Sequence, residues 1–561
     1  MWLKVKSLER GNRRRGEELG RVVSLLLAVG FVAGLDAMPV RGQETNHQAH
    51  QGGPVPREIL ERPVPLRPGI GTLHEKVGTV SPEAQAFYDQ GLAYVHSYVW
   101  IEAVRSFHQA LRSDPNLAMA FLGLTDAYIG LHDVSTARAA FLRAQALEKK
   151  LSERERLWIA IRGRELDYLE DSGDPDKYVN YRKSISNALK VSPSDPWLWI
   201  QRGLADEGSP FVHGQAGGVD TLAFYKIAMD LAPSNTVAHH YYAHSLENAG
   251  RAKDALSEAE TYVRMAPAIP HAHHMRGHEL LRLGRTEEAI GEFVKTKELE
   301  DEYYRTENIP ARYDWHHGHN LQMLALSYQT LGQMKSAETL FRQVFLLPAY
   351  TDFLEYNRRA WPEFLLHRGR PEEALKAAQE LIASPWPMAR LAGHTLAGQA
   401  QLAMDRMNDA QAELTLAERE TEHLPPQSLA VLPYPGALRA EILLREKNTA
   451  AGEELTRDIE KLIVAAPGPD AWSAALFELE SIAQSARQLG DWELAGDTAR
   501  ELVQHDPSYA GGYFELGLVA EHTGDAAKAR QQFATAEKLW SKADKDLPEL
   551  KRIHGTSTAQ R

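Results

Sequence analysis

The sequence predicts an all-α fold made of repeated helical hairpins, and three observations lead to this prediction. Apolar residues recur with the period of an α-helix through most of residues 81–545. A similar pattern of large and small residues returns at intervals of about 34 residues. No stretch sustains the alternation of apolar and polar residues that is typical of a strand. The chain of 561 residues exceeds one ordinary domain, and a repeat array accounts for that length.

The clearest copy of the repeat begins at Ala510 and reads AGGYFELGLVAEHTGDAAKARQQFATAEKLW. Its marked positions are a large residue, a Leu-Gly pair, a small residue, a turn glycine, and then Ala, Phe and Ala on a second helix: Tyr513, Leu516, Gly517, Ala520, Gly524, Ala529, Phe533 and Ala536. Residues 84–115 and 118–147 carry the same pattern, and further copies begin near 236, 270, 318, 355, 391 and 476. The pattern resembles the tetratricopeptide-repeat (TPR) family. The resemblance implies an α-solenoid, a right-handed superhelix of helical hairpins with a concave groove.

Most of these copies have a glycine at the turn, namely Gly250, Gly284, Gly332, Gly369 and Gly490. The copy near 391 lacks one and has Met407 and Asn408 after Arg406. Two stretches, about 148–235 and 421–470, fit the repeat poorly but keep the helical period, so we interpret them as irregular helical hairpins.

The N-terminus is predicted to be a secretory signal region over residues 1–42. Seven Lys and Arg residues precede an apolar run at 22–35, and small residues follow it. Fourteen residues are too few to cross about 30 Å of hydrocarbon as a helix. We therefore expect an exported protein, periplasmic or secreted, with no stable membrane insertion after the signal is removed. An uncleaved membrane anchor is the alternative.

Four further segments are predicted after the signal. Residues 43–80 are rich in Pro and Gly, and they form a linker or a strap lying on the folded body. Residues 81–345 form an N-terminal TPR array with a histidine-lined groove, and residues 346–545 form a C-terminal array. Residues 546–561 are a tail.

Composition excludes several classes of function. The net charge of −13 argues against a nucleic-acid-binding protein, which would carry a basic surface. The absence of cysteine excludes thiolate metal sites, thiol nucleophiles and disulfides. The chain has no phosphate-binding glycine loop of the usual kinds, no HExxH and no GxSxG.

Histidines gather in one part of the chain. Ten of the 23 histidines lie in residues 239–319. His240 and His244 are four residues apart, and His274 and His278 repeat that pair 34 residues later. Residues at i and i+4 share one face of a helix. The TPR resemblance implies that the second, fifth, ninth and twelfth residues of each first helix line the groove.

In repeats that begin at Thr236 and Pro270, both pairs occupy the fifth and ninth positions. Glu247 occupies the twelfth position of the first of these repeats. His319 occupies the second position of the following one, and Gln322 the fifth. Because adjacent helices lie roughly 8–10 Å apart, we expect these side chains to converge. His271, His273, His316 and His317 precede or open their helices, and we expect them to be solvated.

Paired imidazoles of this kind predict a site for a divalent transition metal. The predicted ligands are His240, His244, Glu247, His274, His278 and His319, enough for one ion with a water-filled position or for two ions. Copper or zinc is the predicted metal, with iron as a further candidate. Two alternatives stay open: an enzyme that uses the same cluster, a hydrolase or oxidoreductase with Glu247 as base or ligand, and a metal-free scaffold that binds a peptide or protein partner in the groove.

Five segments also resemble a group of exported, largely uncharacterised bacterial TPR proteins with paired-histidine motifs. They are residues 81–124, SERERLWIAI at 152–161, HYYAHSLE at 240–247, HMRGHELLRLGR at 274–285 and HNLQML at 319–324. The sequence departs from that group at Gln322, where the second histidine of the last motif would stand. The resemblance implies a site but no reaction.

Overall fold

The computed structural model describes residues 54–207, 214–349, 352–424, 432–466 and 468–559. Every regular element of these residues is a helix, which confirms the predicted all-α fold. None of the described helices is both long and apolar enough to cross a membrane. The predicted signal region, residues 1–42, and the first part of the predicted 43–80 segment lie outside the described residues.

The described residues form two compact units, residues 54–279 and 280–559. The sequence placed a boundary after residue 345, whereas the units divide between Glu279 and Leu280, inside a helix.

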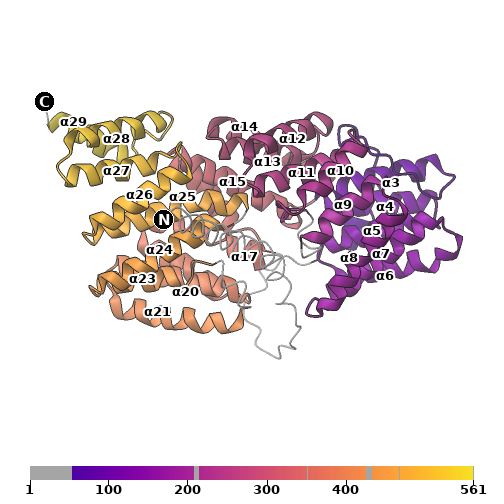
Figure 1. Cartoon of the computed structure of the whole chain (residues 1–561), viewed down its shortest axis with the longest axis horizontal. Helices are drawn as coiled ribbons and strands as arrows, with labels where there is room; N and C mark the ends of the chain where they lie inside the picture. The colour runs from indigo at the N-terminus through magenta and orange to yellow at the C-terminus, as the bar shows by residue number, and fades with distance from the viewer. Residues whose placement is uncertain (1–53, 208–213, 350–351, 425–431, 467, 560–561) are drawn as a thin grey trace, which may run out of the picture. The chain divides into compact units, whose positions relative to one another are not determined.

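The first unit is a succession of helical hairpins, shown from indigo to magenta in Figure 1. Consecutive helices such as α3 and α4, α5 and α6, or α11 and α12 pack against each other. The stretch 148–235, which fits the repeat poorly, also forms helical pairs. The elements are α2 (Arg57–Leu60), α3 (Pro82–Val95), α4 (Trp100–Ser113), α5 (Ala118–Gly130), α6 (Val134–Ala146), η2 (Glu148–Lys150), α7 (Glu153–Glu170), α8 (Pro175–Val191), α9 (Pro196–Asp206), α10 (Leu222–Leu231), α11 (Thr236–Asn248), α12 (Ala252–Met265) and α13 (Pro270–Arg282).

The second unit continues the same arrangement to the C-terminus. The stretch 421–470, which also fits the repeat poorly, includes the hairpin of α23 and α24. The elements are α14 (Thr286–Glu307), η4 (Ala311–Tyr313), α15 (Trp315–Thr330), α16 (Met334–Phe345), α17 (Asp352–Asn357), α18 (Ala360–His367), α19 (Pro371–Ile382), α20 (Pro387–Ala403), α21 (Met407–Glu420), η5 (Thr421–His423), α23 (Gly436–Arg445), α24 (Thr449–Ala465), α25 (Pro469–Gln488), α26 (Trp492–His505), α27 (Ala510–His522), α28 (Ala526–Leu539) and α29 (Pro548–Ala559).

Small residues at fixed repeat positions let the helices approach. The buried ring of Phe107 on α4 lies against Gly91 of α3 and Gly123 of α5. A Cβ atom at these glycines would come within 2.5 and 2.4 Å of the ring. One aromatic side chain therefore joins two successive hairpins, which is how a repeat buries its apolar face against the next.

The helices that bear the paired histidines have clear ends. The side chain of Asn235 accepts a hydrogen bond from the Val237 N–H and caps the start of α11. Gly250 and Gly284 have φ angles of 73° and 70° in the turns that follow α11 and α13, which an L side chain rarely adopts. In the copy near 391, which lacks the glycine, Asp405 takes this conformation with φ 58°.

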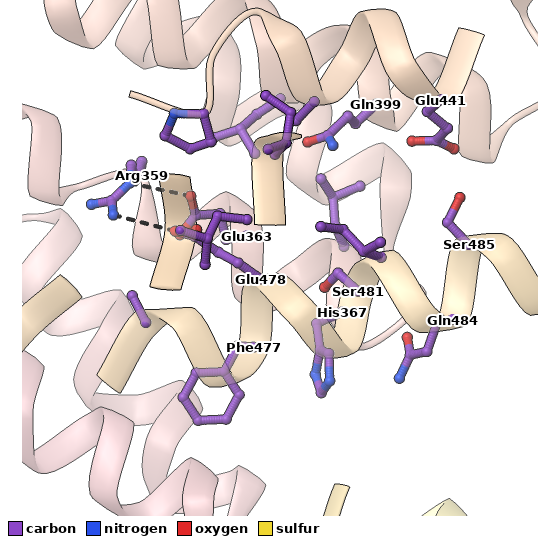
Figure 2. Close-up of a pocket in the computed structure, with 18 of the residues that line it drawn as sticks. Arg359, Glu363, His367, Gln399, Glu441, Phe477, Glu478, Ser481, Gln484 and Ser485 are labelled. Atoms are coloured by element: carbon purple, nitrogen blue, oxygen red, sulfur yellow. Dashed lines mark ion pairs between the residues drawn. The ribbon is translucent and has the colours of Figure 1, made fainter. Parts of the chain in front are cut away.

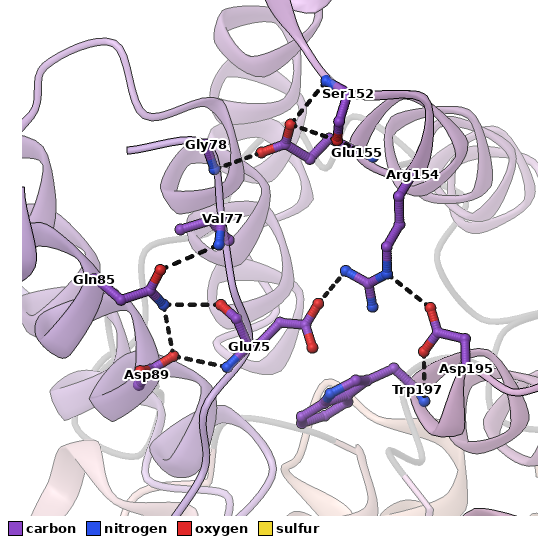
Figure 3. Close-up of polar contacts among 10 residues, drawn as sticks. All are labelled: Glu75, Val77, Gly78, Gln85, Asp89, Ser152, Arg154, Glu155, Asp195 and Trp197. Carbon is purple, nitrogen blue, oxygen red and sulfur yellow. Dashed lines mark hydrogen bonds and ion pairs between the residues drawn. The ribbon is translucent and has the colours of Figure 1, made fainter. Parts of the chain in front are cut away.

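Residues 54–80 lie on the helices of the first unit as a strap, with Val64, Ile70 and Val77 buried. Figure 3 shows how polar side chains of the helices hold its backbone. Gln85 donates to the Glu75 carbonyl at 2.8 Å and accepts from the Val77 N–H at 3.1 Å. Two further strap N–H groups donate to carboxylates: Glu75 to Asp89 and Gly78 to Glu155, at 3.0 and 2.8 Å.

Candidate metal centre

Helices α11 and α13 bring three buried imidazoles together in the first unit. The Nε2 atom of His271 lies 2.9 Å from Nε2 of His240 and 3.4 Å from Nε2 of His244. All three side chains are at least 96% buried. They form a group whose ligand atoms all lie within 4.8 Å of one another.

These separations suit a small cation. Zinc–nitrogen bonds are about 2.0–2.1 Å, so two ligands of a tetrahedral ion lie roughly 3.3–3.4 Å apart. The observed 2.9 and 3.4 Å fall on either side of that value. After small shifts of the side chains, the three nitrogens could therefore provide three of the four ligands of a tetrahedral ion.

The loop between α3 and α4 orients one of the three rings. His240 Nδ1 lies 2.8 Å from the backbone carbonyl of His96. Because a carbonyl only accepts, Nδ1 carries the proton and Nε2 of a neutral ring keeps its lone pair for the cluster. Outer contacts of this kind commonly set the tautomer of metal-binding histidines.

Aromatic rings surround the same imidazoles. His240 stacks on Tyr241 and Tyr262, with ring centroids 4.8 and 5.0 Å apart. The ring of Tyr98, from the α3–α4 loop, lies edge-on to His240 and His271 at 5.0 and 4.6 Å. Burial raises the pKa of Tyr98 well above its usual value. Tyr98 has a φ of 61°, and strained residues of this kind often lie at functional sites.

The other predicted ligands of the first unit form a second set beside these three. Glu247, His274 and His278 are at least 98% buried. Glu247 Oε2 lies 3.6 Å from His278 Nδ1, and the rings of His274 and His278 are 4.2 Å apart. The ring of His274 also stacks at 5.7 Å on that of His271.

His319 belongs to the second unit, on α15. Its Nδ1 atom lies 3.2 Å from Asp470 Oδ2, and its ring stacks on Trp315. His316 and His317 are not solvated, as the sequence suggested, but buried. Their Nδ1 atoms lie 2.6 and 2.8 Å from the two oxygens of the buried Glu300 carboxylate, whose attraction explains the difference.

His271 was also expected to be solvated, and this expectation is wrong. It is the second residue of α13 and of the repeat that begins at Pro270. The second position is one of those that line the groove in the TPR pattern, so the signal was present in the sequence. Its neighbour His273 is partly exposed and contacts the Pro267 carbonyl at 3.2 Å.

A larger pocket lies within the second unit, in the part that the sequence described only as repeats. Helices α15, α16, α18, α20, α23, α24, α25 and α26 contribute to its lining. Figure 2 shows Arg359 at one side, where it pairs with Glu363 and Glu478 at 3.3 and 3.6 Å. Burial raises the pKa of Glu478 to about 7, with Glu363 adding to the rise and Arg359 opposing it.

Residues 481–544, which include α26, α27 and α28, match the family model described as the tetratricopeptide repeat. These residues belong to the tetratricopeptide-repeat superfamily. Their packing agrees: a Cβ atom at Gly517 would come within 2.4 Å of Phe533, the same close approach that Gly91 makes to Phe107.

Solved structures similar to this TPR protein include a tetratricopeptide repeat protein from Parabacteroides merdae, with 14% identity over 47% of this chain and 93% of that chain and a TM-score of 0.33. Another is the human IFIT1 dimer with m7Gppp-AAAA, with 12% identity over 82% and 91% of the two chains and a TM-score of 0.38. At these scores the likeness carries no argument about function. No curated protein sequence matches the chain.

Proposed function

We propose that this TPR protein binds a divalent transition metal ion through the Nε2 atoms of His240, His244 and His271. The observation that supports the proposal is the position of His271, whose Nε2 atom faces both other rings at 2.9 and 3.4 Å. His244 and His240 are predicted ligands, and His271 joins them.

A hydrogen bond alone accounts for this arrangement less well than a metal ion does. Two imidazole nitrogens at 2.9 Å need a proton or a cation between their lone pairs. One proton on His271 Nε2 satisfies one of its two neighbours, whereas one ion is shared by three nitrogens. Protonating a second ring would add a positive charge to a group that is almost fully buried.

Copper or zinc fits the proposed ligands best. Three neutral imidazoles without sulfur suit Zn²⁺, Cu²⁺, Ni²⁺ and Fe²⁺, and the chain has no cysteine to select Cu(I) through thiolate. Three protein ligands leave a coordination position open on a tetrahedral ion. An enzyme that uses this open position remains the alternative prediction.

The test is thermal melting of chelator-treated protein with Zn²⁺, Cu²⁺, Ni²⁺, Mn²⁺ or Fe²⁺ added. Binding to the folded chain alone stabilises it by about 2.7 kcal/mol when the free ion exceeds Kd a hundredfold. The variant H244A/H271A should show a clearly smaller rise in Tm than the wild type, because it lacks two of the three proposed ligands. The matched control H273A removes a histidine of the same helix that contacts a backbone carbonyl, and it should keep the rise. A wild type that no metal stabilises would end the proposal.

A protein-binding role of the first unit is a second candidate, and the strap favours it. TPR proteins commonly bind protein partners. In this chain, side chains of α3 and α7 form hydrogen bonds with the backbone of the strap. A partner peptide would use the same donors and acceptors after displacing residues 74–78. The strap would then act as its competitor.

The proposed function also includes export of the protein. The basic and apolar character of residues 1–42 supports removal of this region on export to the periplasm or the medium. Determining the N-terminal sequence of the exported protein tests this, and an N-terminus that keeps the apolar run at 22–35 would contradict it.

A further inference from the structure

We infer that the centre is dinuclear, with a second metal position made by Glu247, His274 and His278 beside the one made by His240, His244 and His271. This inference rests on the proposed function, because it adds an ion to the same pair of helices. The spacing of the histidines in the sequence is compatible with one ion or with two, and we infer two.

The register of α11 and α13 divides the candidate ligands into two sets. His240 at the fifth position of its repeat meets His271 at the second, and Glu247 at the twelfth meets His278 at the ninth. Each contact therefore joins residues offset by three positions, about one helical turn. This stagger divides the side chains into two sets along the helices instead of focusing all of them on one point.

The ligand atoms of His240, His244 and His271 lie within 4.8 Å of one another, and among the described residues this group does not include His274 or His278. The sets are nevertheless adjacent, because the rings of His271 and His274 stack at 5.7 Å. One ion cannot use all five imidazoles, and two neighbouring ions can.

Glu247, His274 and His278 have the side-chain chemistry of metal ligands. Glu247 Oε2 and His278 Nδ1 are 3.6 Å apart, close to the roughly 3.3–3.4 Å between two ligands of a tetrahedral ion. The Glu247 side chain is completely buried, and a divalent ion would balance the charge of its carboxylate.

The two positions differ in their ligands, so they should differ in affinity. The first offers three imidazoles, and the second offers two imidazoles and a carboxylate. Oxygen ligands shift preference toward harder ions such as Mn²⁺ and Fe²⁺. Titration should therefore show two separate binding steps, whose order can change with the metal.

The experiment measures the metal content of the full-length chelator-treated protein after loading with Zn²⁺ and gel filtration, together with a calorimetric titration. The wild type should hold two ions per chain and bind them in two steps. H274A/H278A and H240A/H271A should each hold one, and the control H273A should hold two. Circular dichroism establishes that each variant is helical.

A milder variant decides the outcome where a double variant does not fold. E247Q keeps the shape of the side chain and removes its charge. It should weaken metal binding at the second position by at least the roughly 10–100-fold that loss of an outer partner of a ligand costs. Binding at the position of His240, His244 and His271 should stay unchanged. Equal weakening of both steps, or of neither, would contradict the second position.

The result also separates this inference from the proposed function. One ion in both the wild type and H274A/H278A, with none in H240A/H271A, would overturn the dinuclear centre and leave the proposed function standing. One ion that is lost only in H274A/H278A would overturn the proposed function. Absence of bound Zn²⁺ from the wild type, and of Cu²⁺, Ni²⁺, Mn²⁺ and Fe²⁺ in the same assay, would overturn both.

Discussion

His240 donates a hydrogen bond from Nδ1 to the backbone carbonyl of His96, which lies 2.8 Å away and 144 residues earlier in the chain. The loop that carries this carbonyl also supplies Tyr98 to the cluster, and the Tyr262 hydroxyl donates to Ser97 Oγ at 2.7 Å. The loop between α3 and α4 therefore positions a proposed ligand, His240, on α11. Loss of this loop should affect metal binding as well as stability.

Tyr98 allows a direct test of that relationship. Y98F keeps the buried ring that lies against His240 and His271, so its zinc affinity should stay near that of the wild type. Y98A removes the ring that lies against His240 and His271, and it should lower the free energy of unfolding by about 3–5 kcal/mol, the usual cost for a buried aromatic residue. Urea unfolding and zinc titration check this. Zinc affinity that is equal in Y98A and the wild type would show that the loop only stabilises the fold.

The strap should open when its main clamp is removed. Q85A deletes the hydrogen bonds to Glu75 and Val77, each worth about 1 kcal/mol, so residues 74–78 should exchange backbone amides roughly tenfold faster or more. Hydrogen exchange with mass spectrometry measures this. Q109A, on the neighbouring α4, is the control. Unchanged exchange in Q85A would mean that burial of Val77, not the clamp, holds the strap.

Glu207 predicts a pH dependence of stability. Burial raises its pKa to about 8 from 4.5, although the Tyr225 hydroxyl and two backbone N–H groups donate to the carboxyl. Between these two pH values the folded chain keeps a proton on Glu207 that the unfolded chain has lost. The contribution of Glu207 to the free energy of unfolding therefore falls as pH rises from about 4.5 to 8.

The measurement compares E207Q with the wild type by urea unfolding at pH 5 and pH 8. The difference in free energy of unfolding between the two proteins should shift by roughly 3–4 kcal/mol in favour of E207Q at the higher pH. Parallel pH profiles would show that the carboxyl of Glu207 titrates alike in the folded and unfolded chains.

The contact between Phe107 and two glycines predicts a steric effect. G123A would place a methyl group 2.4 Å from the Phe107 ring, so the free energy of unfolding should fall by about 1–3 kcal/mol through overpacking. G218A is the control, because a methyl group there meets nothing within 4 Å. Equal Tm values for the two variants would mean that the hairpins can separate without cost.

Much of the fold follows from local pattern, and the structure confirms it. The turn glycines that the repeat predicts, such as Gly250 and Gly284, have positive φ. The stretches 148–235 and 421–470 form helices although they match the repeat poorly. The pocket around Arg359 could not be predicted, because its lining comes from eight of the described helices and no repeat position marks it.

For the candidate site, the sequence by itself determined that His240 and His244 share one helix face and that His274 and His278 share another, because i and i+4 spacing depends only on the helical period. Tertiary structure alone decided which rings meet. The stagger of one turn between α11 and α13 brings His271 to His240 and Glu247 to His278. The close packing of repeats sets this stagger, and it brings the His96 carbonyl to the same place across 144 residues.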